Sequence, residues 1–509
     1  MVPDMLVPPA RIVAAPRMRI YPPRRVKCYR VVTAMAVRIR FPEHSMVQTP
    51  RTIVIVGAGF SGVAVAMQLL RHASIVPVHV TLIDRVGHGR GVAYATHDNP
   101  FLLNVPAGNM SAEPSEPHAF LNFLNVELPG ATAEDFVPRS LYGDYLEQRL
   151  RQAESQAPAG SRLIRIVGSV TGIQRGSGST GFRVALASGQ ELRADAVVIA
   201  HGNHPPAPLP GSEQLTTSSG YVADPWSESV RLRDGETVLV VGTGLTMADV
   251  VIAGARDGPG VRMIALSRHG LLPLPQATFS HSQSAEAMNL RLLAQPGSVR
   301  GLLRAARELS QESEGRGADW REIIAQLRHL ARGIWRDLPA PERARFLRHV
   351  RVYWDIHRHR LPQQTLAELQ RLFATGQLSV SAGRILKLQA DGGAIQVLWR
   401  ARGASQPSTL RVDRVINCTG PSFDPRRLHD ALTQSLLANG LASADPVGLG
   451  LLTSPDGEML GTRGLPVPGL YYIGPLLRAD YWEMGAVPEL REYARKLALR
   501  LVAPPRTSA

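Results

Sequence analysis

The chain of 509 residues has only two cysteines, Cys28 and Cys418, and this scarcity excludes several kinds of site. Two thiols cannot build the disulfide framework of a small secreted scaffold, a four-cysteine zinc site or a cysteine-ligated iron–sulfur cluster. The sequence contains no C-x-x-C redox pair. No apolar run reaches the roughly 20 residues that a membrane-spanning helix needs. We therefore expect a cytoplasmic protein with no metal site and no membrane partner.

Acidic residues are scarce at the N-terminus, although the chain as a whole carries a net charge of +15. Residues 1–45 hold nine Lys and Arg against two acidic residues, which gives this segment nearly half of the total charge. The segment is rich in proline, has no helical or strand periodicity and lacks the apolar core of a signal peptide. We predict that residues 1–45 are a disordered arm or a mis-assigned leader upstream of a true start at Met46, with an organellar targeting segment as the alternative. The modest charge of the remainder disfavours a nucleic-acid partner.

A glycine-rich motif follows an apolar stretch at residues 52–56, which is typical of a buried parallel strand. Its sequence V-G-A-G-F-S-G supplies Gly57, Gly59 and Gly62 and opens a helical pattern. Such glycines let the backbone approach a pyrophosphate, which the helix N-terminus then stabilises. Asp84 ends the next apolar strand, 22 residues after Gly62, where an acid accepts hydrogen bonds from an adenosine ribose. An acid there favours FAD or NAD, because a 2′-phosphate would meet a carboxylate.

A second copy of the pattern begins at Thr237 and reads T-V-L-V-V-G-T-G-L-T-M-A-D. Gly242 and Gly244 match the first two glycines, whereas Met247 replaces the third, so the helix should lie further from its strand. The next strand ends in Ser-Arg-His at residues 267–269 instead of an acid. Arg268 can form a charge-assisted fork with a 2′-phosphate, which favours NADPH at the second site. NADH remains the alternative if Arg268 is only a solvated loop residue.

These two units begin about 185 residues apart and predict an α/β fold with two Rossmann-type domains, the second inserted in the first. We expect an FAD-binding domain at residues 46–210 and 410–509. It encloses an NAD(P)H-binding domain at residues 211–409, with a helical insertion at about 297–375 that is either a lid or a dimer face. Gly474, at the end of a late strand, is a further FAD contact. The helix that follows Trp482, with Pro488 in its first turn, can aim its dipole at the flavin.

Taken together, these motifs resemble the two-dinucleotide-binding flavoproteins, in the branch that includes bacterial FAD-dependent urate hydroxylase and aspartate N-monooxygenase. The resemblance covers about Thr52 to Leu501 and also rests on L-L-N-V-P-A-G-N-M-S, F-V-P-R-S-L-Y-G-D-Y-L, S-R-H-G-L-L-P, Y-W-D-I-H-R-H-R and W-E-M-G-A-V-P-E-L-R. It implies FAD in the first site, NADPH or NADH in the second, and hydroxylation of a small polar substrate with O2. The motif F-x-G-x-x-x-H of Baeyer–Villiger enzymes is absent, which argues against that activity.

The resemblance favours urate as the substrate, with 5-hydroxyisourate as the product. The alternatives are N-hydroxylation of an amino acid or amine, and an NADPH-dependent reductase or dehydrogenase that inserts no oxygen. Outside the enzymes, an RNA-binding, redox-sensing flavoprotein remains possible, and a homo-oligomer is not excluded by the sequence.

The catalytic residues are unknown at this stage, and the candidates near the substrate are Asn104, Arg139, His201 and the pair His357–Arg360. By resemblance, the loop that holds Asn104 passes near the flavin ring, although asparagines also build turns. Arg139 can shape the flavin or substrate pocket, or simply pack at a helix start. His201 in A-H-G can bond to cofactor or substrate, or can be a satisfied core histidine. His357 and Arg360 are three residues apart, so we expect them to share a helix face and line an anion pocket.

Overall fold

The computed structural model describes residues 49–73, 76–95, 101–176, 181–216, 218, 220–227, 230–278, 284–295 and 297–503. The chain divides into two compact units, Met1–Val47 and Gln48–Ala509. The predicted leader at residues 1–45 lies outside the described residues. All that follows concerns the second unit.

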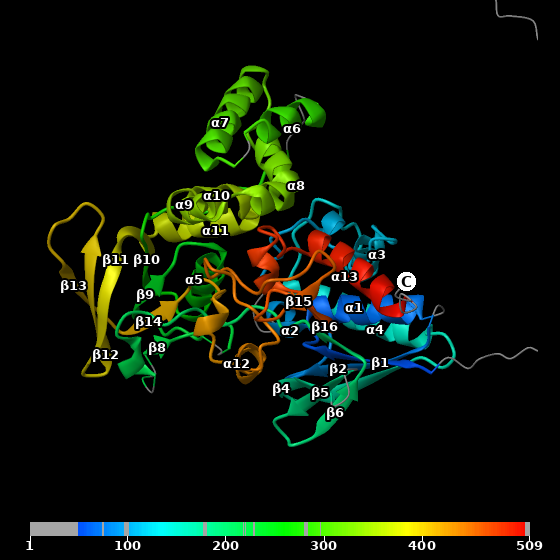
Figure 1. Cartoon of the computed structure of the whole chain (residues 1–509). Coiled ribbons are helices and arrows are strands. Elements are labelled where there is room, and N and C mark those ends of the chain that lie inside the picture. The colour runs from blue at the N-terminus through cyan, green and yellow to red at the C-terminus, as the bar shows by residue number, and fades with distance from the viewer. Residues whose placement is uncertain are drawn as a thin grey trace, which may run out of the picture. The chain divides into compact units, whose positions relative to one another are not determined.

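The first sheet is built from the apolar runs that flank the first glycine motif (Figure 1). In the order β15-β16-β7-β1-β2-β3, its strands are β15 (Glu458–Leu460), β16 (Pro466–Tyr472), β7 (Ala196–Ile199), β1 (Arg51–Val56), β2 (Val78–Asp84) and β3 (Arg162–Val167). All neighbours pair in parallel except β15, which runs antiparallel to β16. Both faces of β1 are buried, as a central parallel strand requires.

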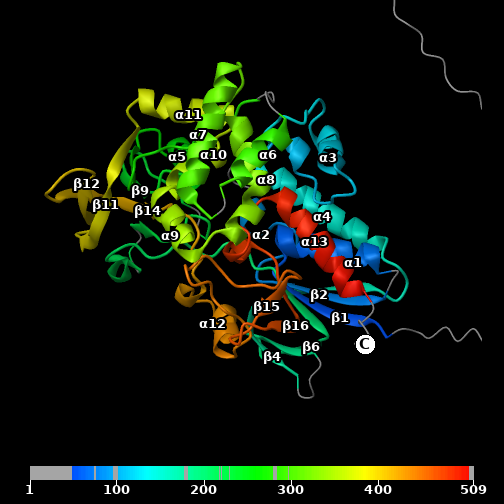
Figure 2. The same ribbon diagram turned by 45° about the horizontal axis from the view of Figure 1, so that its top comes forward.

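Alternation along β1 sends its side chains to two different cores. Ile53 and Ile55 pack against the layer formed by α1 (Phe60–His72), α4 (Arg139–Ser155) and α13 (Val487–Val502). Helix α13 runs alongside α1 in both views (Figure 1, Figure 2). On the other face, Val54 and Val56 pack with α12 (Ala431–Ala438) and an antiparallel sheet of β4 (Val170–Arg175), β5 (Phe182–Leu186) and β6 (Glu191–Ala194). Two short helices, α2 (Gly91–Tyr94) and α3 (Ala119–Glu127), complete this part.

The second sheet repeats the arrangement around the second glycine motif. In the order β13-β12-β11-β10-β9-β14-β8, its strands are β13 (Ser408–Val412), β12 (Ala394–Ala401), β11 (Leu378–Asp391), β10 (Arg262–Ser267), β9 (Thr237–Val241), β14 (Arg414–Asn417) and β8 (Tyr221–Val222). The chain does not return to the first sheet at about residue 410, as the sequence suggested. Because β14 pairs in parallel with both β9 and β8, the return comes only after Asn417.

Helix α5 (Leu245–Asp257) and helix α11 (Gln363–Ala374) pack in the core of the second sheet, and a helical block is inserted between β10 and α11. The block comprises α6 (Ala285–Leu293), α7 (Val299–Gly315), α8 (Arg321–Asp337), α9 (Ala340–His349) and α10 (Arg351–Arg358). It therefore begins earlier than the predicted residue 297. Helix α10 ends at Arg358, so the expectation that His357 and Arg360 share a helix face is wrong.

The inserted block packs against the segment that precedes α13. Trp335 of α8 is buried with its ring 4.7 Å from that of Trp482, and its indole N–H donates to the carbonyl of Ala479 at 3.0 Å. Phe346 of α9 meets Trp482 edge-on at 4.9 Å. Arg332 donates to the hydroxyl of Tyr481 at 3.1 Å. One face of the insertion is thus covered by the chain itself.

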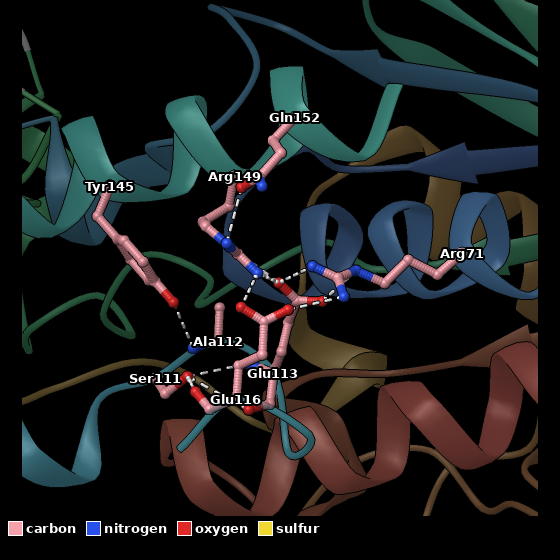
Figure 3. A network of polar contacts seen from close by, with 8 residues as sticks. All are labelled: Arg71, Ser111, Ala112, Glu113, Glu116, Tyr145, Arg149 and Gln152. Atoms are coloured by element: carbon pink, nitrogen blue, oxygen red, sulfur yellow. Dashed lines mark hydrogen bonds and ion pairs between the residues drawn. The ribbon is translucent and has the colours of Figure 1, made fainter. Parts of the chain in front are cut away.

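A polar network fixes the turn at residues 111–116 beneath α1 and α4 (Figure 3). The carboxylate of Glu113 is fully buried and forms ion pairs with Arg71 of α1 and Arg149 of α4. Glu116, which is 39% exposed, pairs with the same two arginines at 2.8 and 2.7 Å. The network holds the end of the 101–111 loop, which carries Asn104, against the helices of the first sheet.

None of the helices in the described ranges combines the length and apolar character that crossing a bilayer demands.

Candidate nucleotide sites

Each of the two large sheets has a topological switch point, where one strand lies between two parallel neighbours that the chain reaches by crossovers in opposite directions. Strand β1 lies between β2 and β7, and β9 lies between β10 and β14. Open α/β sheets bind ligands at the carboxyl edge beside such a point. Both glycine motifs stand at this edge, directly after β1 and β9.

Two glycines of the first motif are required by the fold itself. Gly57 has φ +104°, and a Cβ there would lie 2.5 Å from the carbonyl oxygen of Ala200. A Cβ at Gly62 would lie 1.8 Å from the carbonyl oxygen of Gly57, so strand and helix can approach only with glycine there. Gly59 differs, because its backbone is extended and a Cβ would meet only Gly91, at 3.5 Å. A side-chain carbon at Gly59 would therefore not clash with the fold, and the residue stands at the N-terminus of α1, the kind of position that stabilises an anion.

The second motif reproduces this geometry. Gly242 has φ +114°, and a Cβ there would lie 2.3 Å from the carbonyl oxygen of Cys418. Gly244 also has extended backbone, and a Cβ on it would meet nothing within 4 Å. Met247 replaces the third glycine and is fully buried. Since a Cβ cannot fit at Gly62, the presence of Met247 means that α5 stands further from β9.

The structure identifies the residue that replaces Asp84 in the second unit. The amide N–H of Gly57 donates to the carbonyl of Ile83, and that of Gly242 donates to the carbonyl of Leu266, both at 2.8 Å. Ser267 therefore occupies the position of Asp84, and Arg268 follows it. The side-chain contacts agree. Asp84 accepts from the amide of Ala58 at 2.7 Å, while Ser267 Oγ lies 2.9 Å from the hydroxyl of Thr243, which stands in the place of Ala58.

Positive charge gathers beside Ser267. Arg268 is exposed, and Arg402 lies near it because its amide donates to the carbonyl of Ala382 on the neighbouring strand β11. Burial lowers the pKa of His269, and the charges of Arg402 and Arg268 lower it further. Sequence reasoning found Arg268 but not Arg402, which lies more than 130 residues further along the chain.

His201 lies at the carboxyl edge of the first sheet, between the turns at Gly57 and Gly474. A Cβ on Gly474, which has φ +145°, would lie 3.0 Å from the carbonyl oxygen of His201. The His201 ring packs between His204 and Tyr472, and within the described residues its two ring nitrogens have no hydrogen-bond partner. Burial, together with the charge of His204, lowers the pKa of His201 to about 4. The imidazole is therefore neutral at physiological pH.

Arg139 joins the two nucleotide units. From the first turn of α4, its guanidinium forms an ion pair with Asp249 of α5 at 2.7 Å and lies over the ring of Trp226. Its Nε donates to the carbonyl of Leu102 at 3.1 Å. Burial raises the pKa of Asp249 to about 6, against the opposing effect of Arg139. Asp249 was missed at the sequence level because nothing in T-G-L-T-M-A-D indicates a partner 110 residues away.

Asn104 is half-buried, and its side chain has no hydrogen bond to any part of the chain that the structure describes. Its loop is held by the amide of Leu103, which donates to the carbonyl of Val137 at 2.9 Å. The side chain of Asn104 thus remains available to a ligand. His357 does have a partner, because its Nδ1 lies 2.7 Å from the carbonyl of Tyr353.

Comparisons with known proteins agree with this geometry. Residues 54–204 match a family model described as FAD-NAD(P)-binding. The complex of ornithine N-hydroxylase from Kutzneria sp. 744 with reduced FAD, NADP+ and L-ornithine is similar, with a TM-score of 0.61 and 16% identity over 89% of this chain and 99% of that one. No curated protein matches the chain in sequence.

Two further solved structures resemble the chain to a similar degree. L-lysine 6-monooxygenase from Pseudomonas syringae has a TM-score of 0.59 and 16% identity over 88% of this chain and 98% of its own. FAD-bound cadaverine monooxygenase from Erwinia amylovora has a TM-score of 0.59 and 13% identity over 89% and 95%. At such identities the likeness establishes a shared fold.

Proposed function

We propose that this chain, which has the fold of the two-dinucleotide-binding flavoproteins, is an FAD- and NADPH-dependent monooxygenase that hydroxylates a nitrogen of a small amino acid or amine. The observation that carries the proposal is the pair of open glycine cradles, at Gly59 and Gly244, on two successive Rossmann-type sheets. The fold that surrounds them extends over nearly the whole length of N-hydroxylases of ornithine, lysine and cadaverine.

We assign FAD to the first cradle. Gly57, Gly59 and Gly62 would hold the pyrophosphate against α1, and Asp84 would accept from the adenosine ribose. Gly474 would keep the neighbouring strand end free of side chains. The FAD domain then comprises residues 46–210 and the chain beyond Asn417, with the NADPH domain between them. When bound, the flavin supplies the activation of oxygen, so the protein's own residues need only hold the reactants and exclude water.

We assign NADPH to the second cradle. Gly242 and Gly244 would hold the pyrophosphate against α5, and Ser267 leaves no carboxylate to repel a 2′-phosphate. Arg268 would bind that phosphate, with Arg402 close enough to contribute.

None of the comparisons supports urate as the substrate. In the structure, two of the candidate residues near the substrate, Arg139 and His201, offer no unpaired positive charge. A monoanionic purine needs cationic partners, but Arg139 is neutralised by Asp249 and the His201 ring is uncharged. Because the fold extends over nearly the whole length of N-hydroxylases of ornithine, lysine and cadaverine, N-hydroxylation replaces urate oxidation as the main proposal.

The experiment that tests the function is NADPH oxidation by the purified, flavin-containing protein in the presence of candidate substrates. L-ornithine, L-lysine, L-aspartate, cadaverine and urate are compared under labelled oxygen. We expect an amino acid or amine to accelerate oxidation and to yield a labelled hydroxylamine. Acceleration without incorporated label would identify a reductase instead, and acceleration by urate alone would restore the urate proposal.

We predict that Arg268→Ala weakens NADPH binding and leaves NADH binding nearly unchanged. Losing a charge-assisted contact costs about 1.5–3 kcal/mol, or roughly 10- to 150-fold in affinity. Both affinities are measured by titrating the flavin-containing protein with each nucleotide. Arg85→Ala is the matched control, because Arg85 follows Asp84 as Arg268 follows Ser267, and it should not change NADPH affinity. Equal losses for both nucleotides in Arg268→Ala would discard the assignment.

A further inference from the structure

Four arginines lie close together where the inserted helical block contacts α13 and the segment before it. Three of them have a carboxylate partner, namely Arg321 with Asp319, Arg328 with Glu489, and Arg358 with Glu483. The fourth, Arg360, lies so close to the others that burial and their charges lower its pKa to about 10. Each of these three carboxylates is paired with another arginine, so none of them is left for Arg360.

Arg360 is the member without a partner. Its Nε and Nη1 are buried and form no hydrogen bond within the described ranges, and no ion pair to it is present there. Its backbone is fixed, because the amide of Leu361 donates to the carbonyl of Leu274 at 2.9 Å and the carbonyl of Leu361 accepts from Gln276 at 2.8 Å. The side chain of Arg360 is half-buried, and the nearby carboxylate of Asp319, which favours its charge, is already paired with Arg321. A partly buried charge without a bonded counter-charge is unfavourable, so a fixed guanidinium of this kind is adapted to an anion that arrives from outside the chain.

The position of Arg360 connects it to both nucleotide units. Arg358, two residues earlier, donates to Glu483 at 2.7 Å, and Glu483 lies four residues before the start of α13. Helix α13 packs on α1, whose N-terminus carries the cradle at Gly59. On the other side, Arg321 donates to the carbonyl of Pro275, in the segment that follows β10. The cluster thus lies where the insertion meets both halves of the enzyme.

We infer that Arg360 binds a carboxylate of the substrate, so that the substrate is an amino acid and not a simple amine. The inference rests on the proposed function, which by itself covers both classes. A planar guanidinium with two free donors matches a carboxylate or a phosphate. The phosphate would come from NADPH, but the structure already places Arg268 and Arg402 beside the second cradle. A substrate held by the insertion would lie next to the segment that leads into α13.

The test measures binding to the full-length, flavin-containing protein by calorimetric titration. L-ornithine, L-lysine and L-aspartate are the probes, and putrescine and cadaverine are the decarboxylated counterparts of the first two. We expect at least one amino acid to bind, and Arg360→Met to weaken it roughly 10- to 150-fold. Arg360→Lys should recover part of the lost affinity, because lysine keeps the positive charge but lacks the planar pair of N–H donors of a guanidinium. Arg336→Gln is the matched control, since Arg336 is an exposed arginine of the same insertion and its loss should change nothing.

A second readout excludes a structural role for Arg360. In the absence of ligand, Arg360→Met should unfold at the same temperature as the natural protein or higher, because it removes a half-buried charge that has no ion-pair partner. An arginine that held the insertion together would instead lower the unfolding temperature, and that result would overturn the inference.

The remaining outcomes separate this inference from the proposed function. Hydroxylation of an amino acid with an unchanged KM in Arg360→Met keeps the function and overturns the carboxylate site. Amino-acid binding that depends on Arg360 but leads to no hydroxylated product supports the site and overturns the function. Loss of NADPH binding in place of amino-acid binding, equally tight binding of the amines, or binding of none of the amino acids also overturns the inference.

Discussion

Purified Gly59→Val should be colourless, because its valine side chain would occupy the space over α1 that we assign to the pyrophosphate of FAD. The fold itself should tolerate the change. The backbone at Gly59 is extended, which any residue can adopt, and the new Cβ would contact only Gly91 at 3.5 Å. Flavin content is measured from the visible spectrum, and folding from far-ultraviolet circular dichroism. A folded variant with its full flavin content would contradict the assignment.

Gly244→Val is the matched control at the second cradle. It should retain flavin, because the first cradle is untouched, but NADPH should no longer reduce that flavin. Gly57→Val is less informative, because φ of +104° and the carbonyl of Ala200 at 2.5 Å would strain the fold with or without a cofactor. Loss of flavin from Gly244→Val would indicate that the two cradles are assigned in the wrong order.

The largest loss of stability is expected from Glu113→Gln. Its carboxylate is fully buried between Arg71 and Arg149, and neutralising it leaves two guanidinium groups close together, with the partly exposed Glu116 as the remaining carboxylate of the network. Breaking a buried ion pair by removing one partner costs about 3–5 kcal/mol. The free energy of unfolding is measured by urea denaturation.

Glu116→Gln provides the comparison, since it removes a charge from the same two arginines but from a side chain that is 39% exposed. Exposed ion pairs contribute about 0–1 kcal/mol, so this variant should be close to the natural protein. Similar losses in the two variants would mean that the burial of Glu113 does not determine the strength of the network.

Local sequence patterns were enough to predict the two glycine turns and the strands and helices that flank them. The predicted strand at 52–56 corresponds to β1, the helical pattern opened by V-G-A-G-F-S-G corresponds to α1, and Pro488 lies in the first turn of α13. These features depend on residues within a few positions of one another, such as apolar runs followed by glycines. Counting from the glycines placed the substitute for Asp84 at residues 267–269. Only the strand register identified it as Ser267.

Contacts between distant residues could not be predicted in the same way. Arg139 was expected either to shape a flavin or substrate pocket or to pack at a helix start. Its partner Asp249 belongs to a different glycine motif, and no local signal connects the two residues. The role of the insertion stayed open because an amphipathic helix reveals that it has a partner but not which one. The partner of the insertion is the aromatic segment around Trp482, near the C-terminus.

The pair of Arg139 and Asp249 has a consequence for movement during turnover. Rotating one nucleotide unit against the other would pull apart a guanidinium and a carboxylate whose side chains are only 11% and 10% exposed. Separating such a pair while either group stays buried costs several kcal/mol, so the ion pair favours one relative orientation of the two units. If NADPH occupies the second cradle as we propose, we expect its exchange with NADP+ to occur through local opening of loops, with the two units kept in one relative orientation.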